Sequence, residues 1–353
     1  MLEHEGENIT NDSEKAEILN NFFARVLKTE PDGDHLNIPL PETLHNETIY
    51  DILITPDTVR DKLCKLHLNK ACGADGFHVN ILKNVPDLDV PFSMLFNSSL
   101  REGIIPQDWK DANIIPLFKK GSRLSPNSYR PVSLTSQVVK IIERIIYDQL
   151  MEFIEVNNII SCHQHGFRKK YSCVTQLLEC LFDWTKYYDE DKGVDAIYLV
   201  FRKAFDTVPH ARLIYKLQHL GVRGHLLAWI RGFLSGRRQR VILRNGSSSW
   251  NKVTSGVPQG SILGPLLFLL YVNDIPDAIS SSIARMFADD TKMYRRVSGP
   301  GHLGEGVVGA CAPPGAQGGA MNERGKKKTK KRKREEKREE KGKRKKGEEK
   351  KER

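Results

Sequence analysis

Two stretches of the sequence decide how it folds, and they are Phe287-Ala288-Asp289-Asp290 and Ala196-Ile197-Tyr198-Leu199-Val200-Phe201-Arg202-Lys203-Ala204-Phe205-Asp206. The first sets two adjacent carboxylates between apolar flanks, and the second has the pattern of a buried strand that runs into a turn. Two-metal phosphoryl transfer needs carboxylates from two such segments, which hold a pair of Mg²⁺ ions about 3.5–4 Å apart. Only the first stretch has carboxylates at the expected positions.

Six blocks along the chain carry a family resemblance. In order, they are Asn69–Gly76, Ile114–Gly121 leading to Tyr129–Leu134, Gln164–Arg168, Lys203–Val208, Gly256–Pro265 and Phe287–Asp290. From about Asn8 to Val297, the chain resembles the reverse transcriptase domain of non-LTR (LINE-type) retrotransposons, of the jockey/CR1-like kind. A single F-A-D-D is a weak signal, whereas six blocks in the family's order and spacing are specific.

The resemblance implies an α/β (α+β) fold, the right-hand polymerase fold, with helical fingers and a palm of antiparallel strands. We predict five regions, which are an N-terminal helical region (1–68), a fingers-like region (69–190), a palm-like region with the F-A-D-D motif (191–297), a Gly/Ala/Pro-rich linker (298–324) and a disordered basic tail (325–353). In the family a thumb follows the palm. No matching sequence follows Val297, so we expect the thumb to be missing.

Apolar periodicity predicts the main elements. Helical stripes run over 19–27, 59–66, 142–153 and 174–184, with caps at Asn11 or Asp12 and at Thr55-Pro56. Each stripe is expected to face the core, because a helix needs an apolar face to pack. Strands are predicted over 194–201, around an Asn245-Gly246 hairpin, and on both sides of the Ala288-Asp289-Asp290 turn.

The resemblance implies that Asp289 and Asp290 are catalytic and bind Mg²⁺. On the residues alone, the pair could equally be a solvated turn. The family's strand motif Y-L-D-F-S-K-A-F-D has its first catalytic Asp where this chain has Val200. Valine cannot coordinate Mg²⁺, which takes oxygen ligands. Asp195 should face the other side of the strand, about 16 Å away at ~3.3 Å per residue, and Asp206 lies beyond its end, so neither replaces the missing ligand.

Substrate-binding roles are also implied only by the resemblance. Phe205 matches the aromatic residue that rejects a ribose 2′-OH, although core packing is its ordinary role. Gln259 and Gly260 match the loop that shapes the nucleotide and template pocket. Lys119 and Arg130 match the residues that hold the incoming triphosphate, although either is by itself an ordinary surface charge.

The net charge of +11 lies in the tail. Residues 325–353 hold 18 Lys and Arg against 7 Glu, so residues 1–324 sum to zero. A nucleic-acid-binding body must therefore use a local basic patch, for which Arg237, Arg238 and Arg240 are candidates. The tail is typical of nuclear localisation signals and of non-specific nucleic-acid binding, and equally of a solvated segment without a role.

The remaining composition indicates an intracellular protein. Its six cysteines form no C-x-x-C pair, which favours reduced thiols over disulfides or a zinc site. The N-terminus has no signal-peptide pattern, and the longest apolar run, 262–272, is too short to span a membrane. The sequence leaves the oligomeric state open.

Three functions stay open. The favoured one is an RNA-directed DNA polymerase (nucleotidyltransferase) domain that acts on an RNA template, a DNA primer and dNTPs with Mg²⁺, and that is catalytically impaired by Val200. The alternative is a non-catalytic nucleic-acid-binding remnant. The third is an active polymerase, which requires Val200 to be a local error.

Overall fold

The computed structural model describes residues 1–30 and 47–298. These residues belong to one compact unit, which runs from Met1 to Ala310. The predicted tail, and all but the first residue of the predicted linker, lie outside the described residues. Within the described residues, helices and strands are mixed, so the predicted α/β (α+β) class is confirmed.

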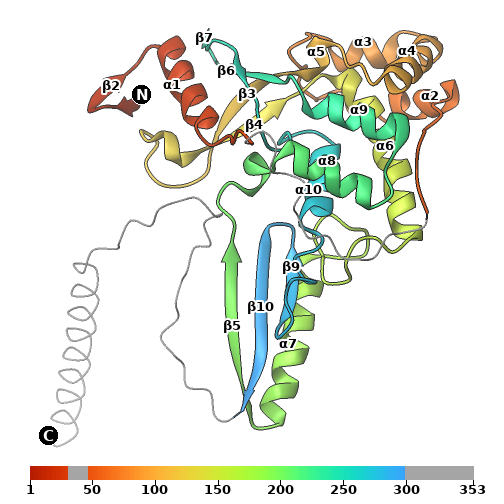
Figure 1. The fold of residues 1–353 in the computed structure, drawn as a ribbon. Coiled ribbons are helices and arrows are strands. Elements are labelled where there is room, and N and C mark those ends of the chain that lie inside the picture. The colour runs from red at the N-terminus through yellow and green to blue at the C-terminus, as the bar shows by residue number, and fades with distance from the viewer. Residues whose placement is uncertain (31–46, 299–353) are drawn as a thin grey trace, which may run out of the picture. The chain divides into compact units, whose positions relative to one another are not determined.

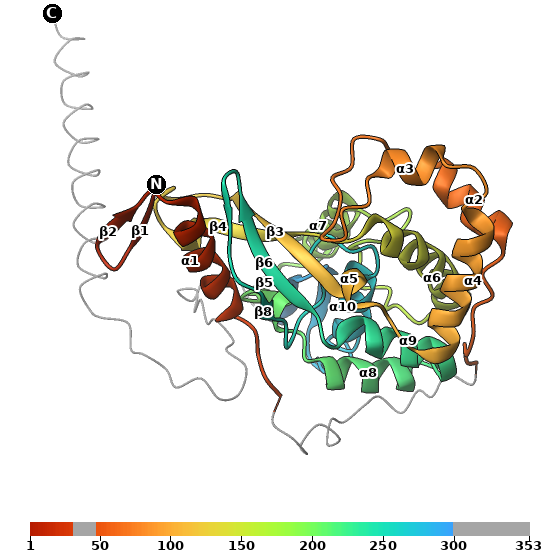
Figure 2. The ribbon, with the colours of Figure 1, turned by 90° about the horizontal axis from the view of Figure 1, so that it is seen from above.

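Helices enclose the larger hydrophobic core. α10 (Leu263–Val272) is buried on almost every side and packs against α6 (Gln137–Val156) and α8 (His210–His219). α4 (Asp89–Glu102) lies between α9 (Gly224–Leu234) and α2 (Pro56–Cys64), which also packs against α6 (Figure 2). Two short helices complete this part, α3 (Val79–Asn84) and α5 (Gln107–Lys110).

A five-stranded sheet lies beside these helices, in addition to the helical structure predicted for the fingers. Its order is β4 (Tyr129–Leu134), β3 (Asp111–Phe118), β6 (Arg238–Leu243) and β7 (Gly246–Ser247), with β8 (Asn251–Lys252) also paired to β6. β3 and β6 are parallel, and the other pairs are antiparallel. α1 (Asp12–Ala24) packs on β6 over a second, smaller core. The hairpin of β1 (Leu2–His4) and β2 (Glu7–Ile9) precedes it.

A separate antiparallel sheet carries the acidic turn. Its order is β5 (Lys192–Val200), β10 (Asp290–Ser298) and β9 (Ile283–Phe287), so β10 is central (Figure 1). α7 (Cys173–Asp189) packs against β9 and β5. The predicted strands on both sides of Ala288-Asp289-Asp290 are therefore confirmed, and β10 continues to Ser298.

The predicted helix starts are confirmed by their caps. Asn11 Oδ1 accepts hydrogen bonds from the backbone N–H of Ser13 at 2.8 Å and of Glu14 at 3.2 Å. Thr55 caps α2 just before Pro56, where a missing N–H costs nothing. α7 also has a cap, one that was not predicted: Ser172 and Thr175 form a reciprocal capping box at its start.

The prediction that the apolar stripe of α7 faces the core is wrong for most of its length. Leu178 is 58% exposed and Phe182 is 70% exposed. The same face carries three more exposed apolar residues, which are Val174, Leu177 and Leu181. α7 contacts the sheet with its polar face instead. Periodicity shows which face of a helix is apolar but not which face a neighbouring element covers.

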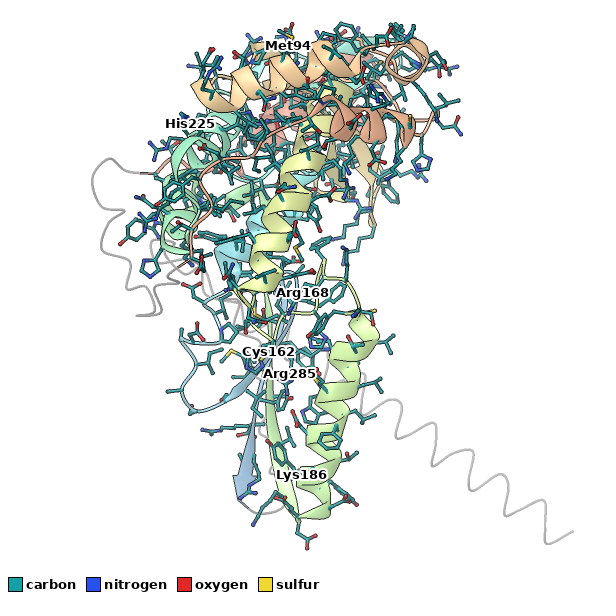
Figure 3. All side chains as sticks on the ribbon, turned by 90° about the vertical axis from the view of Figure 1, so that its right-hand side faces the viewer. Met94, Cys162, Arg168, Lys186, His225 and Arg285 are labelled. Carbon is teal, nitrogen blue, oxygen red and sulfur yellow. The ribbon has the colours of Figure 1, made fainter. Side chains whose placement is uncertain are left out.

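Polar contacts hold that other face of α7 to the sheet. Arg285 of β9 lies between the sheet and the helix, where it pairs with Glu179 at 3.1 Å and Asp183 at 3.2 Å (Figure 3). Tyr294 of β10 donates its hydroxyl to Asp183 at 2.5 Å. Trp184, the one stripe residue that meets the sheet, packs edge-on against Tyr294.

The described residues contain no helix with the length and apolar character that a membrane span requires. α10, which holds the longest apolar run, is a core helix.

Candidate active site

The acidic pair lies where β9 turns into β10. Ala288 takes a left-handed backbone conformation with φ 55°, which is uncommon for a residue with a side chain. Asp289 is half-buried in the turn, and Asp290 begins β10 and is exposed. Burial, with the neighbouring Asp290 charge adding to it, raises the pKa of Asp289, and the charge of Lys119 acts in the opposite direction. A carboxylate in such a position is stabilised by a nearby cation.

Val200 lies directly across the strand pair from Asp290. The register of β5 and β10 pairs Asp290 with Val200 and Thr291 with Leu199. Residues in such positions have Cβ atoms about 4.5–5.5 Å apart. The Val200 side chain is 73% exposed, so solvent, not a packed core, surrounds it. A carboxylate at position 200 would therefore join the two aspartates without a change of register.

Neither of the nearby aspartates, Asp195 and Asp206, takes that place. Asp195 of β5 lies opposite Arg295 of β10, and the Nη2 atom of Arg295 lies 3.5 Å from the Oδ2 atom of Asp195. Asp206 lies past the strand end and accepts a hydrogen bond from Gln259 Nε2 at 2.7 Å. Among the described residues, no group of three or more His, Cys, Asp or Glu side chains is close enough to hold a metal ion. Asp289 and Asp290 offer the oxygen ligands that suit Mg²⁺, and Val200 offers none.

Gln164 supports the acidic turn, a role that the sequence did not reveal. Its Oε1 accepts hydrogen bonds from the backbone N–H groups of Ala288 at 2.9 Å and Gly166 at 2.7 Å. Its Nε2 donates to the Ala288 carbonyl at 3.4 Å. Gln164 belongs to one of the six blocks, but its hydrogen-bond partner Ala288 lies 124 residues away, so no local pattern indicates this role.

The backbone reinforces this support. Met286 donates its N–H to the His163 carbonyl at 2.8 Å and accepts the His165 N–H at 2.9 Å. A Cβ on Gly166 would lie 2.4 Å from the Ala288 nitrogen, so only glycine fits. The strained Ala288 conformation is therefore held from outside the turn.

Two of the predicted substrate-binding segments lie side by side. Val257 donates its N–H to the Phe205 carbonyl and Gly256 donates to the Val208 carbonyl, both at 2.8 Å. The Phe205 ring stacks on Phe268 of α10 with centroids 4.3 Å apart. The ordinary role of Phe205, core packing, is therefore present in the structure beside the role implied by the resemblance.

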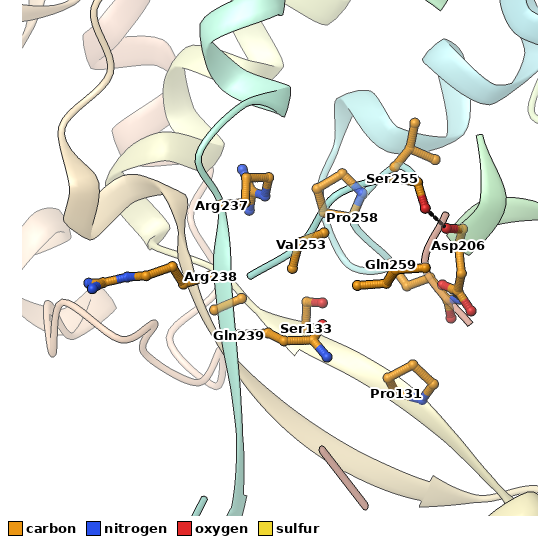
Figure 4. A pocket seen from close by; sticks show the side chains of 14 residues that line it. Pro131, Ser133, Asp206, Arg237, Arg238, Gln239, Val253, Ser255, Pro258 and Gln259 are labelled. Atoms are coloured by element: carbon orange, nitrogen blue, oxygen red, sulfur yellow. Dashed lines mark hydrogen bonds between the residues drawn. The ribbon is translucent and has the colours of Figure 1, made fainter. Parts of the chain in front are cut away.

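The side chain of Gln259 is held by a hydrogen bond within the protein. Its amide donates to Asp206, whose pKa is raised by burial, beside a small cavity of about 40 Å³ that both residues line (Figure 4). Gly260 has φ 123°, and a Cβ there would lie 2.4 Å from the Ser133 carbonyl oxygen. The Gln259 carbonyl accepts the Ser133 N–H at 2.8 Å, which ties this loop to the end of β4.

Lys119 and Arg130 belong to the β3–β4 hairpin, and both are exposed. The charge of Lys119 opposes the burial that raises the pKa of Asp289. Arg130 lies across the strand pair from Leu117. The structure thus associates Lys119 with the acidic turn and leaves Arg130 on the hairpin surface.

The three arginines of the predicted basic patch differ in environment. Arg237 is buried and donates to the Phe233 carbonyl at 3.1 Å, and burial lowers its pKa to about 10. Arg238 makes two hydrogen bonds to Asp111, at 2.6 and 3.0 Å. Arg240 bonds Asn113 and lies over the Trp250 ring at 4.6 Å. Only Arg238 and Arg240 present partly exposed charge, and nucleic-acid binding by the patch stays a prediction.

Glu143 of α6 is a second residue that sequence reasoning missed. It is fully buried and accepts the backbone N–H of Ile262 at 2.6 Å and of Leu263 at 3.1 Å. These N–H groups open α10, and Ile262 follows Gly260 by two residues. Burial raises the pKa of Glu143, against the backbone hydrogen bonds and the Arg237 and Lys140 charges. A carboxylate at a helix N-terminus is favourable, so Glu143 fixes the start of α10.

Comparison with known proteins identifies the family. Residues 118–296 match the model of the reverse transcriptase (RNA-dependent DNA polymerase) family. The matched residues include the acidic turn, Val200 and the Gly256–Gly260 loop. The chain belongs to this family.

Its relatives include proteins encoded by mobile elements of Drosophila melanogaster. A probable RNA-directed DNA polymerase from transposon BS is 32% identical over 285 residues, which cover 77% of this chain and 30% of that protein. The corresponding protein of the X-element is 33% identical over 277 residues, or 76% of this chain and 30% of that protein. The RNA-directed DNA polymerase from mobile element jockey is 33% identical over 63% of this chain and 24% of its own length. The predicted relation to LINE-type reverse transcriptase domains is confirmed, and the chain spans about a third or less of these relatives.

Proposed function

We propose that the site is a catalytically impaired nucleotidyl-transfer centre of an RNA-directed DNA polymerase. The observation that carries this proposal is the β5–β10 register, because it sets Val200, which offers no ligand atom, opposite Asp290. RNA template, DNA primer and dNTP are the proposed substrates, on the basis of the family and of the relatives' names.

The residues present account for part of the chemistry. When bound, Mg²⁺ would neutralise the triphosphate and activate the primer 3′-OH, and Asp289 and Asp290 would hold it. Lys119 would supply positive charge that acts on Asp289. Phe205 and the Gln259–Gly260 loop would form the floor of the nucleotide pocket, which Glu143 keeps in place through the first turn of α10.

Primer extension with Mg²⁺ tests the proposal. Val200→Asp should incorporate dNTP on an RNA template at least about a thousandfold faster than the natural sequence, because metal stabilisation is worth several kcal/mol and each ~1.4 kcal/mol is tenfold in rate. Val200→Asn is the matched control, because it has the same shape without the charge and should gain far less. Adding Asp289→Ala to Val200→Asp should remove the gain.

One result would overturn this reading. Strong extension by the natural sequence that disappears in Asp289→Ala would mean that another group completes the metal site.

A non-catalytic nucleic-acid-binding remnant is the second candidate. It is favoured by the charge distribution, since the whole net charge of +11 resides in residues 325–353. Such a tail attracts phosphate backbones without sequence preference and would suit nuclear targeting. Binding that persists in Asp289→Ala while extension is absent in every variant would support this candidate over the first.

A further inference from the structure

The carboxylate of Asp206 holds one particular end of the Gln259 side chain. Gln259 Nε2 donates to Asp206 Oδ1 at 2.7 Å, and the two residues line the same small cavity (Figure 4). An ionised carboxylate accepts hydrogen bonds and donates none, whereas a carboxamide has a donor end and an acceptor end. Asp206 therefore binds the NH₂ end of Gln259 and not its carbonyl end.

Packing alone would not fix this orientation. The NH₂ and C=O ends of a carboxamide have nearly the same size, so an atom that only touches them does not distinguish one from the other. The cavity of about 40 Å³ also leaves room beside both side chains. In the part of the chain that the structure describes, the bond to Asp206 is the only hydrogen bond of the Gln259 side chain. The orientation of this carboxamide thus depends on Asp206.

The backbone on both sides of this hydrogen bond is fixed. The Asp206 carbonyl accepts the Ser255 hydroxyl at 2.7 Å, and a Cβ on Gly256 would lie 2.7 Å from the same carbonyl oxygen. The Gln259 carbonyl accepts the Ser133 N–H at 2.8 Å. What remains free to turn is the side chain of Gln259, and the carboxylate of Asp206 restrains it.

The charge state of Asp206 is influenced by three neighbouring effects. Burial raises the pKa of Asp206, and the hydrogen bond from Gln259 and the charge of Lys203 act in the opposite direction. The contact with Gln259 therefore favours the ionised form, which is the form that accepts hydrogen bonds without donating any.

The acceptor end of Gln259 is left available. Gln259 is partly exposed, and within residues 1–30 and 47–298 its Oε1 accepts no hydrogen bond. Phe205 precedes Asp206 and Gly260 follows Gln259, and both belong to the segments proposed to form the nucleotide pocket. An acceptor between these segments suits a hydrogen-bond donor of the nucleotide, either a sugar hydroxyl or a base amino group.

We propose that Asp206 is a positioning residue, which orients the carboxamide of Gln259 so that its carbonyl oxygen meets a hydrogen-bond donor of the incoming nucleotide. The identity of this ligand rests on the proposed function, whereas the orientation of Gln259 is independent of it. Asp206→Asn keeps the shape but has an NH₂ group of its own, so it binds either end of Gln259. A turned carboxamide presents its NH₂ group to the nucleotide donor, and that hydrogen bond is lost.

Side-chain amide NMR of the full natural chain tests the orientation without any polymerase activity. The chain carries isotope-labelled glutamine, and Gln259→Ala identifies the Gln259 signal by its loss. Exchange of the Gln259 NH₂ protons with water should be about tenfold or more faster in Asp206→Asn, because the charged acceptor is replaced by a neutral one. Equal exchange in the two chains would overturn the proposal, with thermal unfolding showing that both are folded.

Single-nucleotide incorporation tests the consequence, with Val200→Asp as the parent. Adding Asp206→Asn should raise the KM for dNTP by about tenfold and change kcat by less than about threefold, since the lost contact exists both before and during the reaction. A structural defect would instead lower kcat with the active fraction and leave KM unchanged. In a Gln259→Ala background, Asp206→Asn should leave KM unchanged, because Asp206 acts only through Gln259.

Ser255→Ala is the matched control. It removes the hydroxyl that donates to the Asp206 carbonyl and leaves the carboxylate in place. This variant should lose thermal stability and keep the KM of the parent. A rise in KM as large as that caused by Asp206→Asn would mean that a loosened backbone, not the carboxylate, sets KM, and the proposal would fail.

The remaining outcomes are also decisive. A KM increase that persists in the Gln259→Ala background, or a fall in kcat with KM unchanged, would overturn the positioning role. With a dideoxynucleotide the KM effect of Asp206→Asn should vanish if the 3′-hydroxyl is the donor and persist if a base amino group is, and either result supports the proposal. No extension by Val200→Asp would count against the proposed function alone, and the amide exchange would then decide whether Asp206 orients Gln259.

Discussion

Removal of the Glu143 side chain should destabilise the domain strongly. Glu143→Ala leaves the backbone N–H groups of Ile262 and Leu263 without an acceptor in a buried site. Each such group costs about 1–3 kcal/mol. The substitution also leaves the buried Arg237 without the attraction of this carboxylate, and it relieves the cost of burying the carboxylate itself. The net loss should be about 3 kcal/mol of unfolding free energy.

Glu143→Gln is the matched control. The glutamine carbonyl can accept the same two N–H groups, so its unfolding free energy should lie within about 1 kcal/mol of that of the natural chain. Urea unfolding monitored by circular dichroism measures both variants. A Glu143→Ala domain as stable as the Glu143→Gln domain would refute the assigned role.

The unfolding free energy of the natural chain, compared with that of Glu143→Gln, should depend on pH. Burial raises the pKa of Glu143 above its unfolded value. As pH rises from the unfolded pKa to the folded pKa, the unfolded chain ionises first, so stability falls. Below this window the group contributes no slope. Glu143→Gln should therefore gain stability relative to the natural chain across the window and keep a constant difference above it.

Three further outcomes are expected. Gly166→Ala should lower the unfolding free energy by about 2 kcal/mol, because its Cβ would press on the Ala288 nitrogen at 2.4 Å, and an unchanged urea midpoint would contradict this. Leu178→Lys with Phe182→Lys should reduce binding of an apolar dye and aggregation while changing stability by less than about 0.5 kcal/mol, and a large stability loss would mean that this face is packed. Deletion of 325–353 should weaken RNA and DNA binding and flatten its salt dependence, and unchanged affinity at two salt concentrations would assign binding to the body.

Local signals predicted much of the fold. Asn11 and Thr55-Pro56 mark helix starts because a cap acts on N–H groups two or three residues away. The turn at Ala288-Asp289-Asp290 followed from apolar runs on either side of it. The family relation rested on six ordered blocks, and the family match over residues 118–296 confirmed it.

Local signals failed where the outcome depends on a distant partner. The α7 stripe at Leu178 and Phe182 is apolar and helical, as predicted, but it lies on the exposed face. Arg237 belongs to a basic run in the sequence and is buried in the structure.

By itself, the sequence determined the helices, the acidic turn, the family and the absence of a carboxylate at position 200, because these depend on residue identity and on spacings of a few residues. Only the tertiary structure decided that Val200 lies across from Asp290, 90 residues away, and that Gln164 and Glu143 hold the turn and α10 in place. It also decided that, among the described residues, β5 lies at the edge of its three-stranded sheet. Strand pairing and buried hydrogen bonds join segments far apart in the chain, and their geometry is set only when the whole core packs.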